Sequence, residues 1–484
     1  MSGRAVKRYV LRTFIVIVFL SLATFRLAAQ TLEIPGIYEV TSERPVNARA
    51  LANTRADVVR VLDQGDQIEV TDQAIGESIN GVDVWLKVLI DGREAFVHST
   101  LASFVSPLPE TGLVEATSES VTAPVLPQAE VTNDALVVPA RAVQTANPNA
   151  SVAAQAVLAY LYDLPNGDEN RVISGQFGAY GDGTSRATAE EQLQLIFDQS
   201  GLMPALTGMD YQRWDINNMN DFSEPNGFLI DQWNAGMLVN VSWHAGNPWT
   251  GGTSNDWENP DTENPWDSRP VGELVVPGTP AHDRWMRMLD NIASGLQELE
   301  DAGVVVIWRP LHEMNGGWAW WHRQTPEDFS ALWQHMFNYF TVEKGLDNLL
   351  WAYTPMVNNT EWDYRAMYYY PGDAYVDIVG LDKYMNIDED PLALNTWGDY
   401  DALVETGKPF GLFEFGPLPA TGQGWDTVQY DYANLIRDIK RYYPQTVLFQ
   451  AWEYVWQIGR HANASGLLND PWVIVQGELP LWPR

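Results

Sequence analysis

The feature that most constrains the fold is a repeated alternation of short apolar runs with helical segments over residues 151–484. Eight apolar runs are predicted to be buried strands: Arg171–Gln176, Pro204–Met209, Met237–Trp243, Val304–Pro310, Asn348–Thr354, Tyr375–Leu381, Pro409–Phe415 and Val447–Trp452. Segments with helical periodicity lie between them, for example Ala187–Gln199, Pro280–Leu299, Pro326–Phe340 and Thr427–Tyr443. Continuous apolar runs are typical of parallel strands that are covered on both faces. Eight strand–helix units therefore predict a (β/α)8 barrel of the α/β class.

An open, doubly wound sheet is the alternative architecture for alternating strands and helices. Such sheets usually carry a glycine-rich phosphate loop after an early strand. The sequence contains neither a G-x-G-x-x-G nor a G-x-x-x-x-G-K motif. The barrel is therefore the favoured interpretation.

Residues 30–106 are predicted to form a small all-β domain in front of the barrel. Alternating runs are separated by turn signals, among which Asn80-Gly81 and Asp91-Gly92 are strong hairpin dipeptides. The order of four motifs resembles the bacterial SH3-like domain: Val46–Arg49, Val61–Asp66, Trp85–Val88 and Asp91–Val97. Members of that family often bind cell-wall or peptide ligands, so the resemblance implies cell-wall binding. A structural spacer is the alternative role.

Residues 107–150 are predicted to be a linker. The segment has six prolines, no aromatic residue and a single basic residue, Arg141. It cannot bury enough apolar surface to offset the entropy lost on ordering. Its proline content favours an extended spacer.

The first 29 residues are predicted to be a signal peptide. A basic region that includes Arg4 and Arg12 precedes the ten-residue apolar run Phe14–Ala23, and Leu27-Ala28-Ala29 has the small-residue pattern of a cleavage site. A membrane anchor needs about 20 apolar residues, so cleavage after Ala29 is favoured. We expect a secreted or cell-surface protein, or a periplasmic one, without membrane contact after cleavage.

The composition excludes several kinds of partner and cofactor. The chain has 63 acidic and 29 basic residues, a formal net charge of −34, and no cysteine. Nucleic acids require basic residues to neutralise phosphate, and disulfides, iron–sulfur clusters and thiol nucleophiles require cysteine. The acidic loop Asn255–Asn264 lacks EF-hand spacing, so a solvated loop is favoured over a calcium site. We expect a monomer with no metal and no cofactor.

Two glutamates at predicted strand ends suggest the chemistry. In a (β/α)8 barrel the active site lies at the C-terminal ends of the strands, where Glu313 follows the fourth strand and Glu414 ends the seventh. A carboxylate in an otherwise apolar strand is costly to bury, although for either glutamate alone a structural role is the alternative. Glycoside hydrolysis needs two carboxyl groups beside the cleaved bond, and 21 tryptophans supply flat surfaces for sugar rings.

The run Trp308–Trp321, WRPLHEMNGGWAWW, closely resembles the acid/base signature of glycoside hydrolase family 26. Shorter collinear stretches share the resemblance, among them Gly236–Pro248, Val376–Tyr384, Lys408–Gly416 and Phe449–Trp452. That family consists mostly of secreted retaining β-mannanases. The resemblance therefore implies an endo-β-1,4-mannanase that hydrolyses mannan, galactomannan or glucomannan by double displacement. A mixed-linkage β-glucanase or β-xylanase of the same family, and a non-catalytic polysaccharide-binding protein, are the alternatives.

The resemblance also implies roles for individual residues. Glu313 corresponds to the general acid/base and Glu414 to the nucleophile. Further substrate-binding positions that it implies are His244, Arg309, His312, Trp318, Tyr384 and Trp452, with Trp249 and Trp257 as more distant sugar platforms. Within this set, Tyr384 is expected to hydrogen-bond the nucleophile and Trp452 to stack under the sugar. One position departs from the family pattern, because Glu453 stands where some of these mannanases carry an arginine that grips a distant sugar. Endo or exo action is therefore open.

Overall fold

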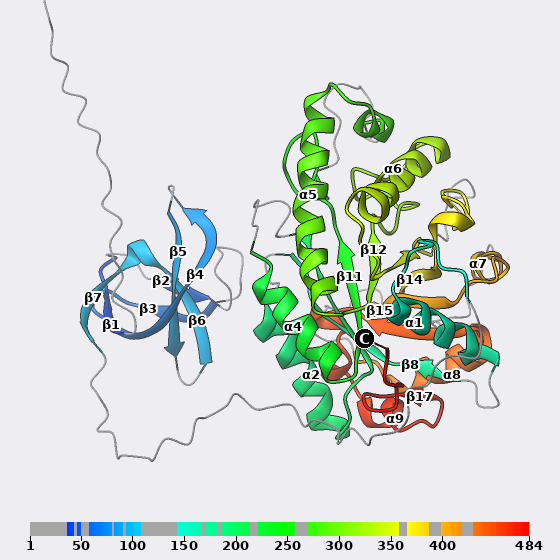
Figure 1. Cartoon of the computed structure of the whole chain (residues 1–484). Helices are drawn as coiled ribbons and strands as arrows, with labels where there is room; N and C mark the ends of the chain where they lie inside the picture. The colour runs from blue at the N-terminus through cyan, green and yellow to red at the C-terminus, as the bar shows by residue number, and fades with distance from the viewer. Residues whose placement is uncertain are drawn as a thin grey trace, which may run out of the picture. The chain divides into compact units, whose positions relative to one another are not determined.

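The structure is a computed structural model and forms two compact units that divide near residue 122 (Figure 1). It describes residues 36–42, 46–49, 58–79, 82–90, 93–107, 143–166, 171–181, 185–212, 221–256, 269–357, 365–386, 398–418 and 429–483. The predicted signal peptide, the predicted hairpin dipeptides and most of the predicted linker lie outside these residues. Each unit is described by itself.

The smaller unit is an antiparallel sheet with the strand order β3-β2-β6-β5-β4-β1-β7. The strands are β1 (Gly36–Val40), β2 (Val46–Arg49), β3 (Val58–Leu62), β4 (Gln67–Ile79), β5 (Val82–Ile90), β6 (Arg93–His98) and β7 (Ala102–Pro107). Alternate residues such as Tyr38, Val40 and Val88 point into its core. This arrangement confirms the predicted small all-β domain.

The larger unit is built on a closed ring of eight parallel strands. The ring consists of β9 (Gly175–Ala179), β10 (Leu206–Asp210), β11 (Leu238–Trp243), β12 (Val306–Pro310), β13 (Leu349–Tyr353), β14 (Ile378–Asn386), β15 (Phe410–Leu418) and β16 (Thr446–Ala451). Strand β16 pairs with both β15 and β9, so the sheet has no free edge within the ring. The predicted (β/α)8 barrel is confirmed.

Helices cover the outside of the ring (Figure 1). They are α1 (Val152–Asp163), α2 (Arg186–Ser200), α4 (Ser223–Asn234), α5 (Pro280–Asp301), α6 (Pro326–Asn338), α7 (Asp399–Val404), α8 (Ala433–Tyr442) and α9 (Ala464–Leu468). The sequence sets several of their starts. Thr279 caps α5 by accepting a hydrogen bond of 3.0 Å from the backbone N–H of His282, and Pro280 follows in the first turn, where its missing N–H costs nothing.

The predicted first strand, Arg171–Gln176, contains a separate short strand and only the first two residues of β9. The apolar residues Val172 and Ile173 form a short strand, β8, that pairs with the ring strand β16 on one side and with β17 (Val473–Ile474) on the other. The ring strand β9 begins at Gly175, whose Cβ position would lie 2.6 Å from the carbonyl oxygen of Phe449. Close packing against β16 therefore requires a glycine at that point, and a less apolar segment becomes the strand.

The N-terminal end of the barrel is fastened by buried polar groups. Asp377, directly before β14, accepts hydrogen bonds from the backbone N–H groups of Ala146 (2.6 Å) and Trp351 (2.8 Å). The Asn147 side chain donates to the Leu346 carbonyl (3.2 Å) and to Asp347 (2.9 Å). The end of the predicted linker thus contacts the barrel. The boundary at residue 151 stays a prediction.

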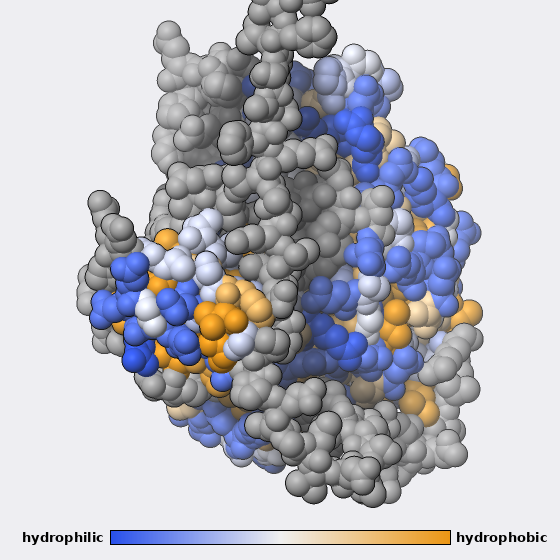
Figure 2. Space-filling model, turned by 90° about the vertical axis from the view of Figure 1, so that its left-hand side faces the viewer, coloured by the Kyte–Doolittle hydropathy of each residue, from blue (hydrophilic) through white to orange (hydrophobic). Residues whose placement is uncertain are grey.

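The described surface mixes hydrophilic and apolar residues (Figure 2). In the smaller unit Val59, Val61, Leu89 and Val105 are large hydrophobic residues with exposed side chains. Within the described part of the chain, no helix combines the length and the apolar character needed to cross a membrane.

Candidate active site

Glu414 lies inside β15 at the C-terminal end of the ring and is surrounded by hydrogen-bond donors. Arg309 of β12 donates to its Oε1 through Nη2, and the Tyr384 hydroxyl of β14 donates to its Oε2 at 2.8 Å. Nε2 of His312 is 3.3 Å from Oε1. Two hydrogen-bond donors and a neighbouring imidazole therefore surround this buried carboxyl group.

The local strand geometry aims Glu414 into the site. The register between β14 and β15 shifts between Leu381 and Asp382, and beyond that shift Asp382 stands beside Glu414. A second irregularity separates Leu412 from Phe415 in the pairing of β15 with β16. Bulges of this kind re-aim side chains at barrel rims. They bring both carboxyl groups onto the Arg309 guanidinium, whose Nη1 is 2.9 Å from Asp382.

Glu313 has the opposite surroundings. It follows β12 in a left-handed backbone conformation, with φ of +53°, and Leu311 has φ of +48°. Positive φ is uncommon for residues other than glycine and is found at functional sites. The backbone N–H of Glu313 donates to the Thr354 carbonyl at 2.8 Å, and the Trp318 indole N–H donates to its carboxyl group. Burial, and then the charge of Glu414, raise the pKa of Glu313 to about 8.

Three carboxyl groups lie close together at this site, and one guanidinium contacts two of them. One oxygen from each of Glu313, Asp382 and Glu414 lies within 4.8 Å of the others, while Arg309 is the guanidinium that contacts two of them. Like charges at this spacing cannot all ionise without cost, so one carboxyl group retains a proton. Burial raises the pKa of both Asp382 and Glu313, to about 8 for Glu313, but Asp382 has the Arg309 guanidinium as a partner at 2.9 Å, so Glu313 is the better proton carrier. The site therefore holds an acid and a carboxylate side by side.

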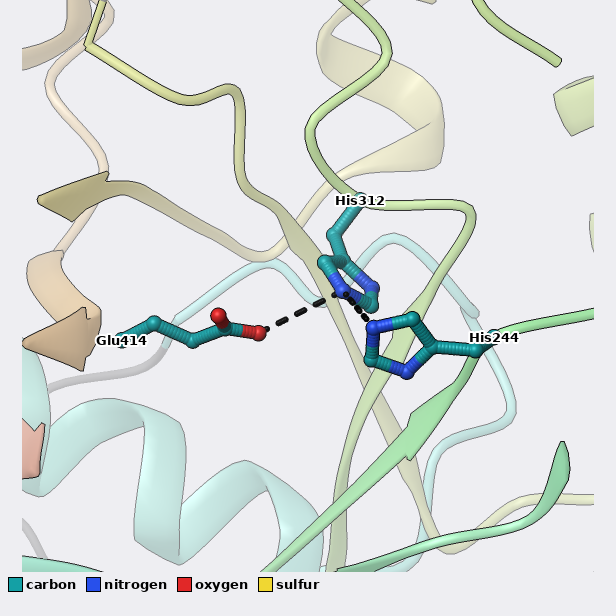
Figure 3. A group of neighbouring side chains, drawn as sticks. All are labelled: His244, His312 and Glu414. Carbon is teal, nitrogen blue, oxygen red and sulfur yellow. Dashed lines mark hydrogen bonds and ion pairs between the residues drawn. The ribbon is translucent and has the colours of Figure 1, made fainter. Parts of the chain in front are cut away.

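A second set of contacts runs from Glu414 through His312 and His244, which Figure 3 draws, to Asp210. Nε2 of His312 is 3.0 Å from Nε2 of His244, and Nδ1 of His244 is 2.6 Å from Asp210. All four side chains are buried. Figure 3 shows the two imidazoles and the carboxyl group of Glu414 pointing toward one another.

Aromatic rings form one wall of the site. Trp452, after β16, stacks on Phe177 with ring centroids 4.3 Å apart, and the Arg309 guanidinium is 6.0 Å from the Trp452 ring. Tyr180 contacts both Trp452 (5.9 Å) and His244 (4.3 Å). A flat ring held from behind in this way is suited to stack against a sugar.

The structure brings together eight of the ten predicted site residues: His244, Arg309, His312, Glu313, Trp318, Tyr384, Glu414 and Trp452. Trp249, in the loop after β11, packs edge-on against Trp320 with ring centroids 5.7 Å apart. Its indole N–H donates to Glu273 at 3.4 Å, and not to Glu313 or Glu414. Trp257 lies outside the described residues.

Sequence reasoning assigned no role to three residues that the site uses. Asp210 and Asp382 occupy the C-terminal parts of β10 and β14, and Tyr180 directly follows β9. The sequence marks the two aspartates, because an aspartate within or at the end of an apolar strand is as costly to bury as Glu414. Glu453 is the position that differs from the family pattern. Burial raises its pKa to about 8, and the charges of Asp210 and Glu414 add to this rise.

Two groups of side chains have the spacing of metal ligands in the described part of the chain. They are His244, His312 and Glu414, and Glu313, Asp382 and Glu414, each with ligand atoms within 4.8 Å of one another. Both groups depend on Glu414, whose Oε1 already accepts from the Arg309 guanidinium. A metal cation there would face a buried positive charge, so the set is suited to hydrogen bonding rather than to ligation. Most of the loop at 255–264 lies outside the described residues.

Comparison with known proteins gives consistent matches over the barrel. The family model described as glycosyl hydrolase family 26 matches residues 146–478, and the one described as bacterial SH3 domain matches residues 45–103. A mannan endo-1,4-beta-mannosidase of Bacillus subtilis (strain 168) is 36% identical over 352 residues, which cover 70% of this chain and 90% of that protein. Mannan endo-1,4-beta-mannosidase A and B of Caldalkalibacillus mannanilyticus is 37% identical over 344 residues, covering 69% and 62%.

A solved structure agrees with these matches. That of Bacillus subtilis mannanase man26 is 35% identical with a TM-score of 0.59, and the match covers 70% of this chain and 96% of that one.

Proposed function

Because the chain belongs to glycosyl hydrolase family 26, we propose that it is a retaining endo-β-1,4-mannanase that hydrolyses mannan-type polysaccharides. The observation that carries the proposal is the pairing of Glu313 with Glu414. One carboxyl oxygen of each lies within 4.8 Å of the other, the raised pKa of Glu313 favours a proton on it, and Glu414 accepts hydrogen bonds from Arg309 and Tyr384. Inverting enzymes keep their two carboxyl groups about 6.5–9.5 Å apart to leave room for a water molecule, whereas retaining enzymes keep them about 5–5.5 Å apart.

The two residues then act in sequence. In the first step Glu414 attacks the anomeric carbon, the glycosidic C–O bond breaks, and Glu313 gives its proton to the leaving oxygen. In the second step Glu313, now ionised, takes a proton from water, and the resulting hydroxide oxygen displaces Glu414 from the anomeric carbon. Microscopic reversibility requires the same group to serve as acid and then as base.

The first test is substrate choice. The purified protein is incubated with mannan, mixed-linkage β-glucan and xylan, and new reducing ends are measured. Mannan should give the highest kcat/KM. A higher value on glucan or xylan would replace the proposal with another activity of the family, and no hydrolysis of any of them would favour a non-catalytic binding protein. Product sizes separate endo from exo action, because endo cleavage releases long fragments early.

The second test is stereochemistry. Proton NMR of the products in the first minutes should show the β-anomer of the new reducing end. Early appearance of the α-anomer would contradict double displacement.

The sites of action and attachment are further parts of the proposal. We propose export through residues 1–29, and attachment to cell walls through the SH3-like unit. Expression in a bacterial host with N-terminal sequencing would test cleavage after Ala29. Binding of the chain to cell walls and to insoluble mannan, with and without residues 30–106, would distinguish an attachment domain from a spacer.

A further inference from the structure

The four side chains from Asp210 to Glu414 come from four different strand ends. Asp210 ends β10, His244 follows β11, His312 follows β12 and Glu414 lies in β15. Contacts of 2.6, 3.0 and 3.3 Å join them in that order. Within this set the contact to Glu414 comes from His312, so the contribution of Asp210 passes through the two imidazoles.

Hydrogen bonds to Asp210 fix the proton on His244. Its Oδ1 accepts from the backbone N–H of Gln212 at 2.8 Å, and its Oδ2 accepts from the Ser242 hydroxyl at 2.6 Å. A carboxylate is an acceptor only, so Nδ1 of His244, 2.6 Å from Oδ2, must be the donor. In the neutral imidazole Nε2 is then an acceptor.

The proton on His312 follows from that on His244. Burial, together with the positive charge of Arg309, lowers the pKa of His312 well below its usual value, so its ring is neutral with one proton. Its Nε2 faces the bare Nε2 of His244 at 3.0 Å, and two bare nitrogens repel at that distance. Nε2 of His312 therefore carries the proton, and the same N–H faces Oε1 of Glu414 at 3.3 Å.

We propose that Asp210 is a positioning residue that fixes, through His244 and His312, the N–H donor facing the Glu414 carboxylate. The inference rests on the proposed role of Glu414 as the nucleophile. The N–H of His312 can be shared between Glu414 and His244. When Glu414 becomes an ester its oxygens accept more weakly, and the N–H turns to His244 instead of losing its partner. The donor is then in place again when the carboxylate is released.

The other groups around Glu414 cannot change in this way. The charged or titratable side chains that act on it besides the two histidines are Tyr180, Arg309, Glu313, Asp382, Tyr384 and Glu453. Among its direct hydrogen-bond donors, Arg309 and Tyr384 have pKa values raised above their usual range, so both keep their protons and only donate. His312 is the one contact that becomes an acceptor if its proton moves to the other nitrogen.

Asp210→Asn tests this directly. The backbone N–H of Gln212 holds the amide oxygen at the Oδ1 position, so the amide nitrogen faces Nδ1 of His244 and donates to it. The proton of His244 then moves to its Nε2 and is donated to Nε2 of His312. Nε2 of His312 must therefore be an acceptor, and its lone pair faces Glu414. We expect kcat/KM to fall roughly 10- to 100-fold, the range for a group that orients a directly acting histidine. The acid limb of the pH profile should move up by about one to two pH units.

Ser242→Ala is the matched control. Its hydroxyl donates to the same oxygen of Asp210, so the variant loses a buried hydrogen bond but keeps the carboxylate and the His244 proton in place. The acid limb should not move. Equal shifts in Asp210→Asn and Ser242→Ala would mean that Asp210 has only a structural role. Melting temperatures of both variants show whether each is folded at the assay temperature.

A measurement on the unmodified protein does not depend on any variant or substrate. Nitrogen-15 NMR of labelled histidines at the pH of activity should show His244 protonated at Nδ1 and His312 at Nε2, with both inverted in Asp210→Asn. The chain has seven histidines, and one His→Gln variant per position assigns the signals. A proton on Nδ1 of His312 in the active protein would overturn the inference. Failure of mannan hydrolysis by the unmodified protein would instead overturn the proposed function.

Discussion

The two ends of the barrel use buried carboxyl groups in opposite ways. At the N-terminal end both oxygens of Asp377 accept backbone N–H groups, and burial raises its pKa only to about 6 because those bonds and Lys408 oppose the rise. At the C-terminal end Glu313 and Glu414 are bonded mainly to side chains that donate or titrate. Backbone partners hold a carboxyl group still, whereas titratable partners let its proton move. The same residue type therefore fastens one end and reacts at the other.

Removing Glu414 should have the largest effect. Glu414→Ala deletes the group that forms the covalent intermediate, so kcat should fall by roughly 10⁴-fold or more on every substrate. Glu300 is the matched control at the other end, where its carboxyl group accepts the backbone N–H of Asp347 at 2.8 Å. Glu300→Ala should lower the melting temperature and leave kcat near its original value. Comparable losses of kcat in the two variants would erase the proposed difference between the two ends.

Removing Glu313 should give a loss that depends on the leaving group. Glu313→Ala should lower kcat about 10²- to 10⁴-fold on mannan, where the leaving oxygen needs a proton. Aryl mannosides with acidic phenols need less help and should lose much less in the first step. Steady-state and burst kinetics over a series of phenols measure this. A loss that is uniform across the series would remove Glu313 from the acid role.

The pH profile should report the raised pKa of Glu313. The group must be protonated to act as an acid, so kcat/KM should fall as the pH rises through about 8. The Trp318 indole stabilises the charged form of Glu313, so Trp318→Phe should move this basic limb to higher pH, by about one unit. Measuring kcat/KM from pH 4 to 10 for both proteins is sufficient. A shift to lower pH would show that Trp318 does not stabilise the carboxylate.

The smallest effect on activity is expected at the N-terminal end. Asn147 is buried and bonds Leu346 and Asp347, so Asn147→Ala should cost about 1–3 kcal/mol in the free energy of unfolding. The cost should appear as a lower denaturation midpoint, with kcat and its pH profile unchanged below the transition. A change in the pH profile would mean that the two ends are coupled.

The strands and catalytic glutamates could be predicted because burial leaves a pattern in the sequence. Predicted runs overlap all eight ring strands, six of them over most of their length, and Glu414 stands out within β15 because its neighbours are apolar. The first strand was predicted only in part, because the apolar residues Val172 and Ile173 form β8, whereas most of the ring strand β9 is the glycine-containing segment that follows them.

The hydrogen-bonded set could not be predicted, because it depends on distances between strand ends. Asp210 and His244 are 34 positions apart, and His244 and His312 are 68 apart. Nothing in the spacing says which nitrogen of either ring faces which neighbour. The left-handed backbone at Glu313 has no glycine to mark it. Both features follow from packing that only the folded chain defines.

The pairing of β8 with β17 sets a condition on synthesis. Arg171 donates to the carbonyl of Val473 at 3.0 Å across 302 positions, and Ser174 donates to that of Ile474 at 2.8 Å across 300 positions. The first repeat therefore gains its last partner only when the ribosome has passed residue 474. Until then the edge of β8 that pairs with β17 has no strand partner, and unpaired strand edges are prone to aggregation. Slow translation of the C-terminal region would lengthen that exposed interval.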